Sequence, residues 1–119
     1  MHKVNLAEKF ATFSEHWSPR IVGALNGQYV KLAKLQGEFV WHHHDQEDEL
    51  FLVVKGSLLM RLKDQDIRIG EGEFFIVPRG VEHQPVAEQE VHVLLFEPAG
   101  TLNTGNVRNE RTIEDLKHA

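Results

Sequence analysis

Short β-type runs separated by glycine-containing turns fill the chain from residue 28 to residue 97, and this pattern constrains the fold more than any other feature. The run Glu49 to Lys55 is apolar at both odd and even positions after its glutamate, so both faces of that strand must be covered. No helical period interrupts the region. Many short strands with tight turns and no intervening helices predict an antiparallel sandwich or barrel.

Alternation along individual runs predicts which side chains face the interior. Leu58, Met60 and Leu62 alternate with a more polar set that includes Arg61 and Lys63. The odd positions from 91 to 95 are apolar in the same way. Residues 29–35 and 38–43 read as two separate strands on either side of a glycine. These patterns predict a largely apolar barrel interior.

The two ends of the chain differ from this central region. Asn5 followed by Glu8 reads as a helix start, and the apolar face of this short helix would pack an N-terminal arm, residues 1–20, against the barrel. The tail, residues 99–119, is polar, and Thr112 with Asp115 predicts a last short helix there. With 119 residues, we expect one domain whose barrel core spans about 28–98.

Composition narrows the classes of partner. The chain carries 18 acidic and 13 basic residues, a net charge of −5, which argues against nucleic acid as the main partner. It contains no cysteine, so a bound metal would need nitrogen and oxygen ligands. No apolar run resembles a signal peptide or a membrane span, and the expected location is therefore cytoplasmic.

Histidines gather at two places in the central region. His42 and His44 are two apart on an expected strand, so their side chains should share a face, and Glu49 opens the next strand. His83 follows a Pro-x-Gly turn. Three imidazoles and a carboxylate suit one divalent ion of Mn, Fe, Co, Ni or Zn, with positions left open for water or substrate. A solvent-facing strand that is merely rich in histidine is the alternative for the first pair.

The acidic ligand has two candidates. Asp48 stands next to Glu49 and carries the same chemistry. Glu49 is preferred because it shares the parity of Phe51 and Val53, both expected to point inward, and lies seven positions before Gly56.

The two glycine-bounded segments, G-x4-H-x-H-x4-E-x6-G and G-x5-P-x-G-x2-H, resemble the two motifs of the cupin superfamily, and the chain is similar to small single-domain cupins. The resemblance implies an all-β double-stranded β-helix, or jelly-roll, barrel around a metal ion. It assigns the ligand roles to four residues: His42, His44, Glu49 and His83. Two positions depart from the family pattern. Four residues instead of five precede the first histidine, and Ala87 replaces a common asparagine.

Three further residues have plain structural readings. His43 and Trp41 should point away from the ligands, to pack under the arm or at a dimer interface. His92 lies among apolar neighbours and reads as a core histidine. The doubly apolar strand at 49–55 together with Trp41 predicts a homodimer.

Several functions fit these features. The first is a metal-dependent enzyme that acts on a small organic molecule, of dioxygenase, decarboxylase or isomerase type. The others are a non-catalytic binding or sensing module and a barrel with a structural metal. A sugar-phosphate isomerase of the mannose-6-phosphate-isomerase kind is disfavoured, because Arg61 and Lys63 have outward parity and only Lys55 could reach a phosphate, from the rim.

Overall fold

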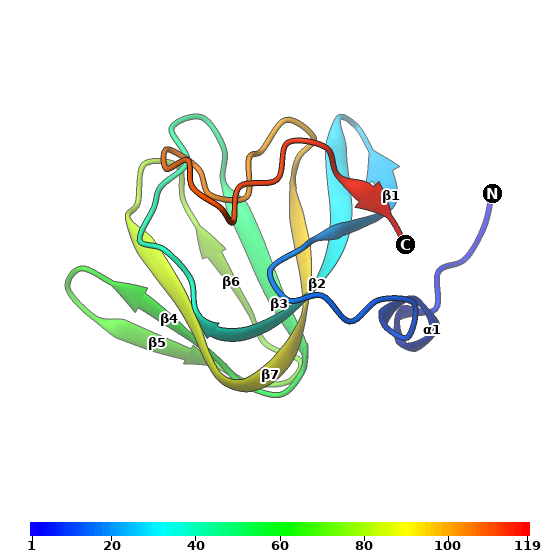
Figure 1. The fold of residues 1–119 in the computed structure, drawn as a ribbon, viewed down its shortest axis with the longest axis horizontal. Coiled ribbons are helices and arrows are strands. Elements are labelled where there is room, and N and C mark those ends of the chain that lie inside the picture. The colour runs from blue at the N-terminus through cyan, green and yellow to red at the C-terminus, as the bar shows by residue number, and fades with distance from the viewer.

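The computed structural model describes all residues, 1–119, and confirms the predicted all-β barrel with a short helix at its N-terminal end (Figure 1). The elements are α1 (Leu6–Phe10), β1 (Arg20–Leu25), β2 (Gln28–Glu38), β3 (Glu49–Lys55), β4 (Leu58–Leu62), β5 (Asp66–Ile69), β6 (Phe74–Val77), β7 (His83–Pro98) and β8 (Lys117–His118). The helix is too short to cross a membrane.

The long strand β7 joins the parts of the barrel. Its first residues pair with β4, and its second half pairs with β2 on one edge and β3 on the other, all antiparallel. The far edge of β3 pairs with β6. Strands β2 and β7 therefore hold together segments that lie far apart in the sequence, and the two histidine-bearing segments meet at the same end of the barrel.

The interior follows the predicted alternation. Along β3, Glu49, Phe51 and Val53 are buried, whereas the positions between them are half-buried on the outer face. Leu58 and Met60 of β4 are fully buried. One apolar cluster of fourteen residues fills the barrel, and burying this much apolar surface is the main driving force for folding.

The N-terminal arm covers the outer face of the sheet, as predicted. The Asn5 side chain accepts a hydrogen bond from the backbone N–H of Glu8 and caps α1. Phe10 and Phe13 then pack on Leu32, outside the barrel. The core assignment of His92 is wrong, because this ring faces outward and is half-buried, with its centroid 4.5 Å from that of Phe10.

The expected strand at 38–43 is also wrong. Strand β2 continues through a bulge at Gly37, where φ is +88°, and ends at Glu38. The next ten residues are irregular except for an isolated bridge between His42 and His83. After the bulge, Gly37 and Glu38 still pair with β7, and the regular strand then ends.

The tail contains no helix, so the prediction from Thr112 and Asp115 is wrong. Thr112 instead bonds through its hydroxyl to the hydroxyl of Thr104, at 2.7 Å, and accepts from the backbone N–H of Asn109. The tail crosses one end of the barrel (Figure 1) and ends in β8, which pairs in parallel with β1. A threonine that bonds across a loop gives the same sequence signal as one that caps a helix.

Candidate metal centre

Four buried side chains converge inside the barrel: His42 and His44 from the loop after β2, Glu49 from β3 and His83 from β7. One ligand atom from each lies within 4.8 Å of those of the others. The exposed fraction of these residues is 5% or less. The structure thus brings together the four residues that the sequence motifs had singled out.

The backbone couples the two motifs directly. His42 donates its backbone N–H to the carbonyl of His83 at 3.0 Å, and His83 returns the bond at 2.9 Å. The two ring centroids lie 4.2 Å apart. These two histidines, forty-one positions apart in sequence, are therefore held as one unit.

Hydrogen bonds orient two of the three rings. Nδ1 of His42 lies 2.9 Å from the carbonyl oxygen of Val40, and Nδ1 of His83 lies 2.9 Å from that of Val81. A carbonyl accepts only, so each Nδ1 carries the proton and each Nε2 keeps its lone pair. This arrangement fixes the tautomer that a metal needs at Nε2. The ring of His44 has no such partner.

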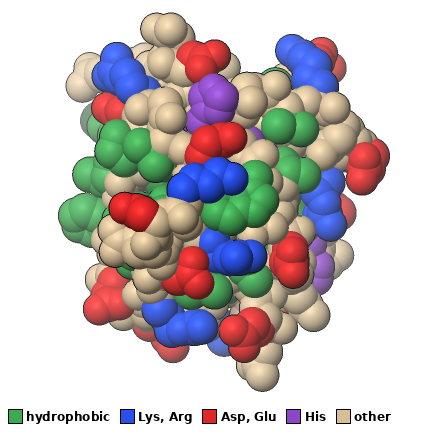
Figure 2. Space-filling view, turned by 90° about the vertical axis from the view of Figure 1, so that its left-hand side faces the viewer, with side chains coloured by type: hydrophobic (Ala, Val, Ile, Leu, Met, Phe, Trp, Pro, Cys, Tyr) green, Lys and Arg blue, Asp and Glu red, His purple; other side chains and the backbone are tan.

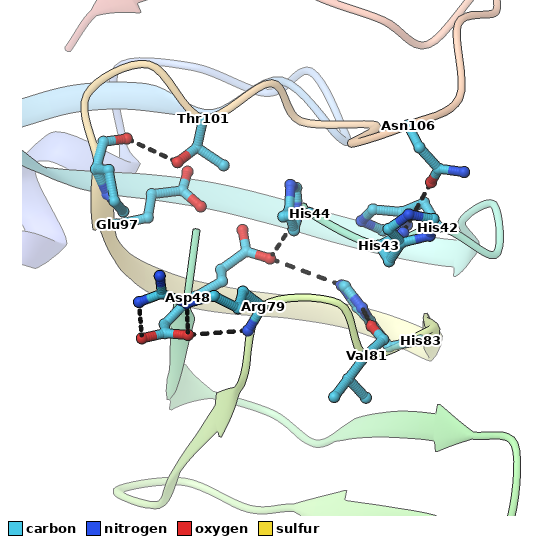
Figure 3. Close-up of polar contacts among 12 residues, drawn as sticks. His42, His43, His44, Asp48, Arg79, Val81, His83, Glu97, Thr101 and Asn106 are labelled. Carbon is cyan, nitrogen blue, oxygen red and sulfur yellow. Dashed lines mark hydrogen bonds and ion pairs between the residues drawn. The ribbon is translucent and has the colours of Figure 1, made fainter. Parts of the chain in front are cut away.

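The carboxylate of Glu49 lies between two of the rings. Its Oε1 is 3.2 Å from Nε2 of His44 and 3.7 Å from Nε2 of His83 (Figure 3). These three atoms are buried and make no hydrogen bond. Buried polar atoms without partners are costly, and a cation placed among them would satisfy all three. The donor set therefore fits a divalent transition metal.

The choice between the two neighbouring carboxylates agrees with the geometry. Asp48 points away from the rings and accepts hydrogen bonds from the backbone and guanidinium of Arg79, the former at 2.8 Å (Figure 3). Arg79 also holds the pKa of Asp48 below its ordinary value. Only Glu49 is placed to act as the acidic ligand.

Burial, together with the nearby His83 ring, lowers the pKa of His42 from 6.5 to about 4. Its imidazole is therefore neutral at physiological pH and keeps a free electron pair on Nε2. A metal ion does not have to compete with a proton for this ligand.

We expect the metal-free protein to lose stability as the pH falls from 6.5 towards 4. The unfolded chain protonates His42 near its ordinary pKa of 6.5, whereas the folded protein holds the ring neutral down to about 4. The unfolded state binds more protons in this window, which costs roughly 3 kcal/mol of folding free energy at its acid end. Urea unfolding of chelator-treated protein at several pH values measures the loss. The His42→Gln variant should show a flatter pH dependence, and equal slopes for the two proteins would contradict the prediction.

A buried ion pair, which the sequence pattern did not reveal, adjoins the site. Lys31 donates to Glu97 at 2.7 Å, and both side chains are 2% exposed. Burial and the neighbouring carboxylate of Glu49 raise the pKa of Glu97 well above its usual range. For Glu49, burial acts against ionisation, but the neighbouring side chains of Glu97, His44 and His83 outweigh it and lower the pKa. The carboxylate of Glu49 therefore disfavours the charged form of Glu97, whereas the ammonium of Lys31 favours it.

The cavity beside these groups is small and mainly apolar. Its volume is about 40 Å³. His42, Glu49 and Glu97 line its polar side, and the rings of Trp17 and Phe39 belong to the apolar wall. These two rings stack with their centroids 4.7 Å apart. A small, largely apolar molecule suits such a space.

The two residues predicted to point outward, His43 and Trp41, do so. His43 lies near Asp45 and Glu82, at 2.9 and 3.2 Å. Trp41 packs under Lys63, whose Nζ is 4.1 Å from the ring centroid, and not under the N-terminal arm. In Figure 2, acidic and basic side chains are interspersed with hydrophobic ones, so this face carries charges of both signs.

Arg111 is another residue that the sequence pattern did not reveal. Its guanidinium lies 5.7 Å from the ring centroid of Trp17 and 6.0 Å from that of Phe39. Asn103, which lines the cavity, donates to the backbone carbonyl of Arg111 at 2.7 Å. The tail therefore supplies both cavity wall and positive charge, although its composition resembles a solvated end.

Comparisons with known proteins agree with this geometry. The model of the Cupin domain family matches residues 28–97, from the start of β2 to the end of β7. A crystal structure of a cupin-2 domain protein from Shewanella frigidimarina superposes with a TM-score of 0.79 at 43% identity, over 80% of this chain and 93% of that one.

Two curated relatives share part of their length with the chain. The uncharacterized protein YdbB of Bacillus subtilis is 36% identical over 78 residues, which are 65% of this chain and 63% of that protein. A 3-hydroxyanthranilate 3,4-dioxygenase of Brucella anthropi is 35% identical over 65 residues, 49% of this chain and 36% of the enzyme. The chain therefore spans less than two thirds of these relatives.

Proposed function

The chain belongs to the cupin domain family, and we propose on this basis that it is a metal-dependent enzyme acting on a small organic molecule. One divalent transition-metal ion would be held by the four convergent residues His42, His44, Glu49 and His83. The observation that carries the proposal is the set of buried ligand atoms on His44, Glu49 and His83 that have no other partner.

Each side chain has a separate part in this proposal. The ion would supply Lewis acidity and open coordination positions. His42 and His83 present Nε2 because backbone carbonyls hold Nδ1. Glu49 brings the negative charge, and Glu97 lines the cavity beside it, paired with Lys31. The apolar wall excludes bulk water from the reacting group, which strengthens the electrostatic interactions inside.

Among the possible reactions, the oxygenase type has support from a relative. The Brucella anthropi protein that matches part of the chain is named 3-hydroxyanthranilate 3,4-dioxygenase. The stacked rings of Trp17 and Phe39 also give the site an apolar wall, which suits a largely apolar substrate. Decarboxylation and isomerisation use the same ion and cavity, and a sugar phosphate fits such a wall least well.

The experiment that tests the proposal combines metal content with turnover. Protein prepared without metal supplementation is subjected to elemental analysis, then incubated with hydroxylated aromatic acids, dicarboxylic acids and sugar phosphates. Oxygen consumption, CO2 release and product formation are followed. Activity that disappears on chelation and returns with one metal would support the enzyme. Metallated protein that binds a member of the panel without turnover would identify a binding module instead.

We also propose that two copies associate through the outer face of β3 and β6. Leu50 pairs with Ile76, and Leu52 pairs with Phe74, so these four apolar side chains share one face. Phe74 and Ile76 are 62% and 49% exposed. The face presents no charged side chain at these positions, so a second copy of the same face is a fitting partner.

The Ile76→Glu variant is expected to shift the protein from dimer to monomer, because two charges would be buried against each other across the interface. Sedimentation velocity at micromolar concentration measures the change. Leu25, at 47% exposure, offers a matched control on β1, and Leu25→Glu should leave the dimer intact. A wild-type protein that sediments as a monomer at high micromolar concentration would contradict the association.

A further inference from the structure

The C-terminal segment, residues 101–113, closes one end of the barrel and makes direct contact with the peptide that carries two of the proposed ligands. A Cβ added at Gly105 would lie 2.2 Å from the carbonyl oxygen of His43 and 3.1 Å from the ring of His42. The φ of Gly105 is +58°. Glycine alone permits both this backbone angle and this approach.

Asn106 binds the same peptide through two hydrogen bonds. Its side-chain Oδ1 accepts from the backbone N–H of His43 at 2.9 Å (Figure 3). Its own backbone N–H donates to the carbonyl of His43 at 3.0 Å. Both polar backbone groups of the residue between His42 and His44 are therefore held by a single asparagine.

His44 depends most on such support. It lacks the ring-to-carbonyl hydrogen bond that orients His42 and His83, and both of its ring nitrogens are without a hydrogen-bond partner. Its backbone carbonyl accepts from Gly80 N–H at 2.7 Å. The position of its imidazole is thus set by the backbone on either side of it.

The C-terminal segment is itself braced, so it can hold another part of the chain. Asn103 accepts from the backbone N–H of Ile113 at 2.9 Å and donates to the carbonyl of Arg111. The hydroxyls of Thr104 and Thr112 bond to each other, and Thr104 is fully buried. These bonds close the segment into a compact loop that presents Gly105 and Asn106 to the ligand peptide.

We propose that Asn106 is a positioning residue for the metal centre: it holds the backbone of His43 so that the imidazoles of His42 and His44 keep their metal-binding separation. This inference rests on the proposed metal site. Residues that orient metal ligands typically change metal affinity about 10- to 100-fold when they are removed. Asn106 acts on the backbone between two ligands, and its loss should affect the geometry of the site as well as the affinity.

The test compares Asn106→Ala with Asn109→Ala. Asn109 lies in the same segment and its Oδ1 accepts from the backbone N–H of Arg111, so this control also removes a side-chain-to-backbone hydrogen bond, away from the ligand peptide. Co²⁺ affinity is measured by competition with a chromogenic chelator, and the visible spectrum of the Co²⁺ protein reports ligand geometry. We expect Asn106→Ala to bind Co²⁺ about tenfold more weakly with an altered spectrum, and Asn109→Ala to match the wild type.

A conservative variant separates positioning from general destabilisation. Asn106→Asp retains the acceptor oxygen and should restore both the spectrum and the affinity, measured at high ionic strength to screen the added charge. Unchanged affinity and spectrum in Asn106→Ala would overturn the inference. An equal loss in Asn109→Ala would also overturn it, because the effect would then belong to the segment as a whole.

A metal-free measurement distinguishes failure of this inference from failure of the proposed function. Hydrogen exchange of the His43 amide should be about tenfold faster in chelator-treated Asn106→Ala than in the wild type, because the bond to Oδ1 is lost. If the wild type binds no Co²⁺, the proposed function fails, and faster exchange still supports the hold on His43. Unchanged exchange contradicts that hold whether or not metal binds.

Discussion

Replacing His83 by alanine is expected to lower the affinity for a divalent transition metal by about a hundredfold or more. The residue is fully buried, and its Nε2 lies 3.7 Å from Glu49 Oε1 with no hydrogen-bond partner. Removal of a supporting partner alone costs about 10- to 100-fold, so loss of a direct ligand should cost at least as much. Competition titration with Zn²⁺ and Co²⁺ measures the change, and elemental analysis gives the occupancy after purification.

His43 supplies a matched control for that experiment. It is also a histidine of the first motif, but its ring lies near Asp45 and Glu82, away from the ligand cluster. His43→Ala keeps the backbone that Asn106 contacts and should leave metal affinity within about twofold of the wild type. Equal losses in the two variants would mean that the convergence of imidazoles does not form the binding site.

Replacement of Lys31 by methionine is expected to lower the free energy of unfolding by about 3–5 kcal/mol. The substitution leaves Glu97 buried without its 2.7 Å partner. Removing one partner of a buried ion pair is strongly destabilising, because the charge of the remaining partner is then neither neutralised nor hydrated. Urea unfolding of the metal-free protein, followed by circular dichroism, measures the effect.

The double variant Lys31→Met with Glu97→Leu should recover most of this stability. Replacing a buried ion pair by apolar residues of similar size is often neutral or stabilising. A double-mutant cycle therefore separates the pair from the packing of its methylene groups. If the double variant is as unstable as the sum of the two single variants, the two side chains do not act as a pair.

The sequence was most informative where residue spacing and strand parity act together. The parity of Glu49 with Phe51 and Val53 correctly placed all three inside the barrel. It also separated Glu49 from Asp48, which the structure places on Arg79. Alternate residues of a strand point to opposite faces of the sheet, so the direction of these side chains can be predicted without knowledge of tertiary contacts.

Long-range polar contacts could not be predicted in the same way. Lys31 and Glu97 are sixty-six positions apart and look like ordinary charged positions of half-exposed strands. Their burial depends on the register of β2 against β7, which composition does not reveal. The alternation within β2 gave one usable signal, because Lys31 shares the parity of the buried Ala33 and Leu35.

The predicted helix in the tail was wrong for a related reason. Thr112 carries the signature of a helix cap, and its partner, Thr104, lies eight positions away on the other side of a loop. Prediction of helix caps considers only the residues next to a threonine in the sequence, so it does not account for a hydrogen bond to a residue across a loop. The approach of Gly105 to His43 is equally non-local, and a glycine in a polar tail gives no indication of it.

The reciprocal backbone bonds between His42 and His83 have a consequence for how an ion would be captured. These bonds fix the two backbones, and the bonds from Nδ1 to the carbonyls of Val40 and Val81 orient the rings, so two of the four donors form a chelating pair of fixed separation. The facing side-chain atoms of His44 and Glu49 have no hydrogen-bond partner, so these two donors can adjust by side-chain rotation while the backbone of His44 stays held. The fixed separation of His42 and His83 would therefore select ions by their radius. The adjustable side chains of His44 and Glu49 would complete the coordination number that the ion prefers.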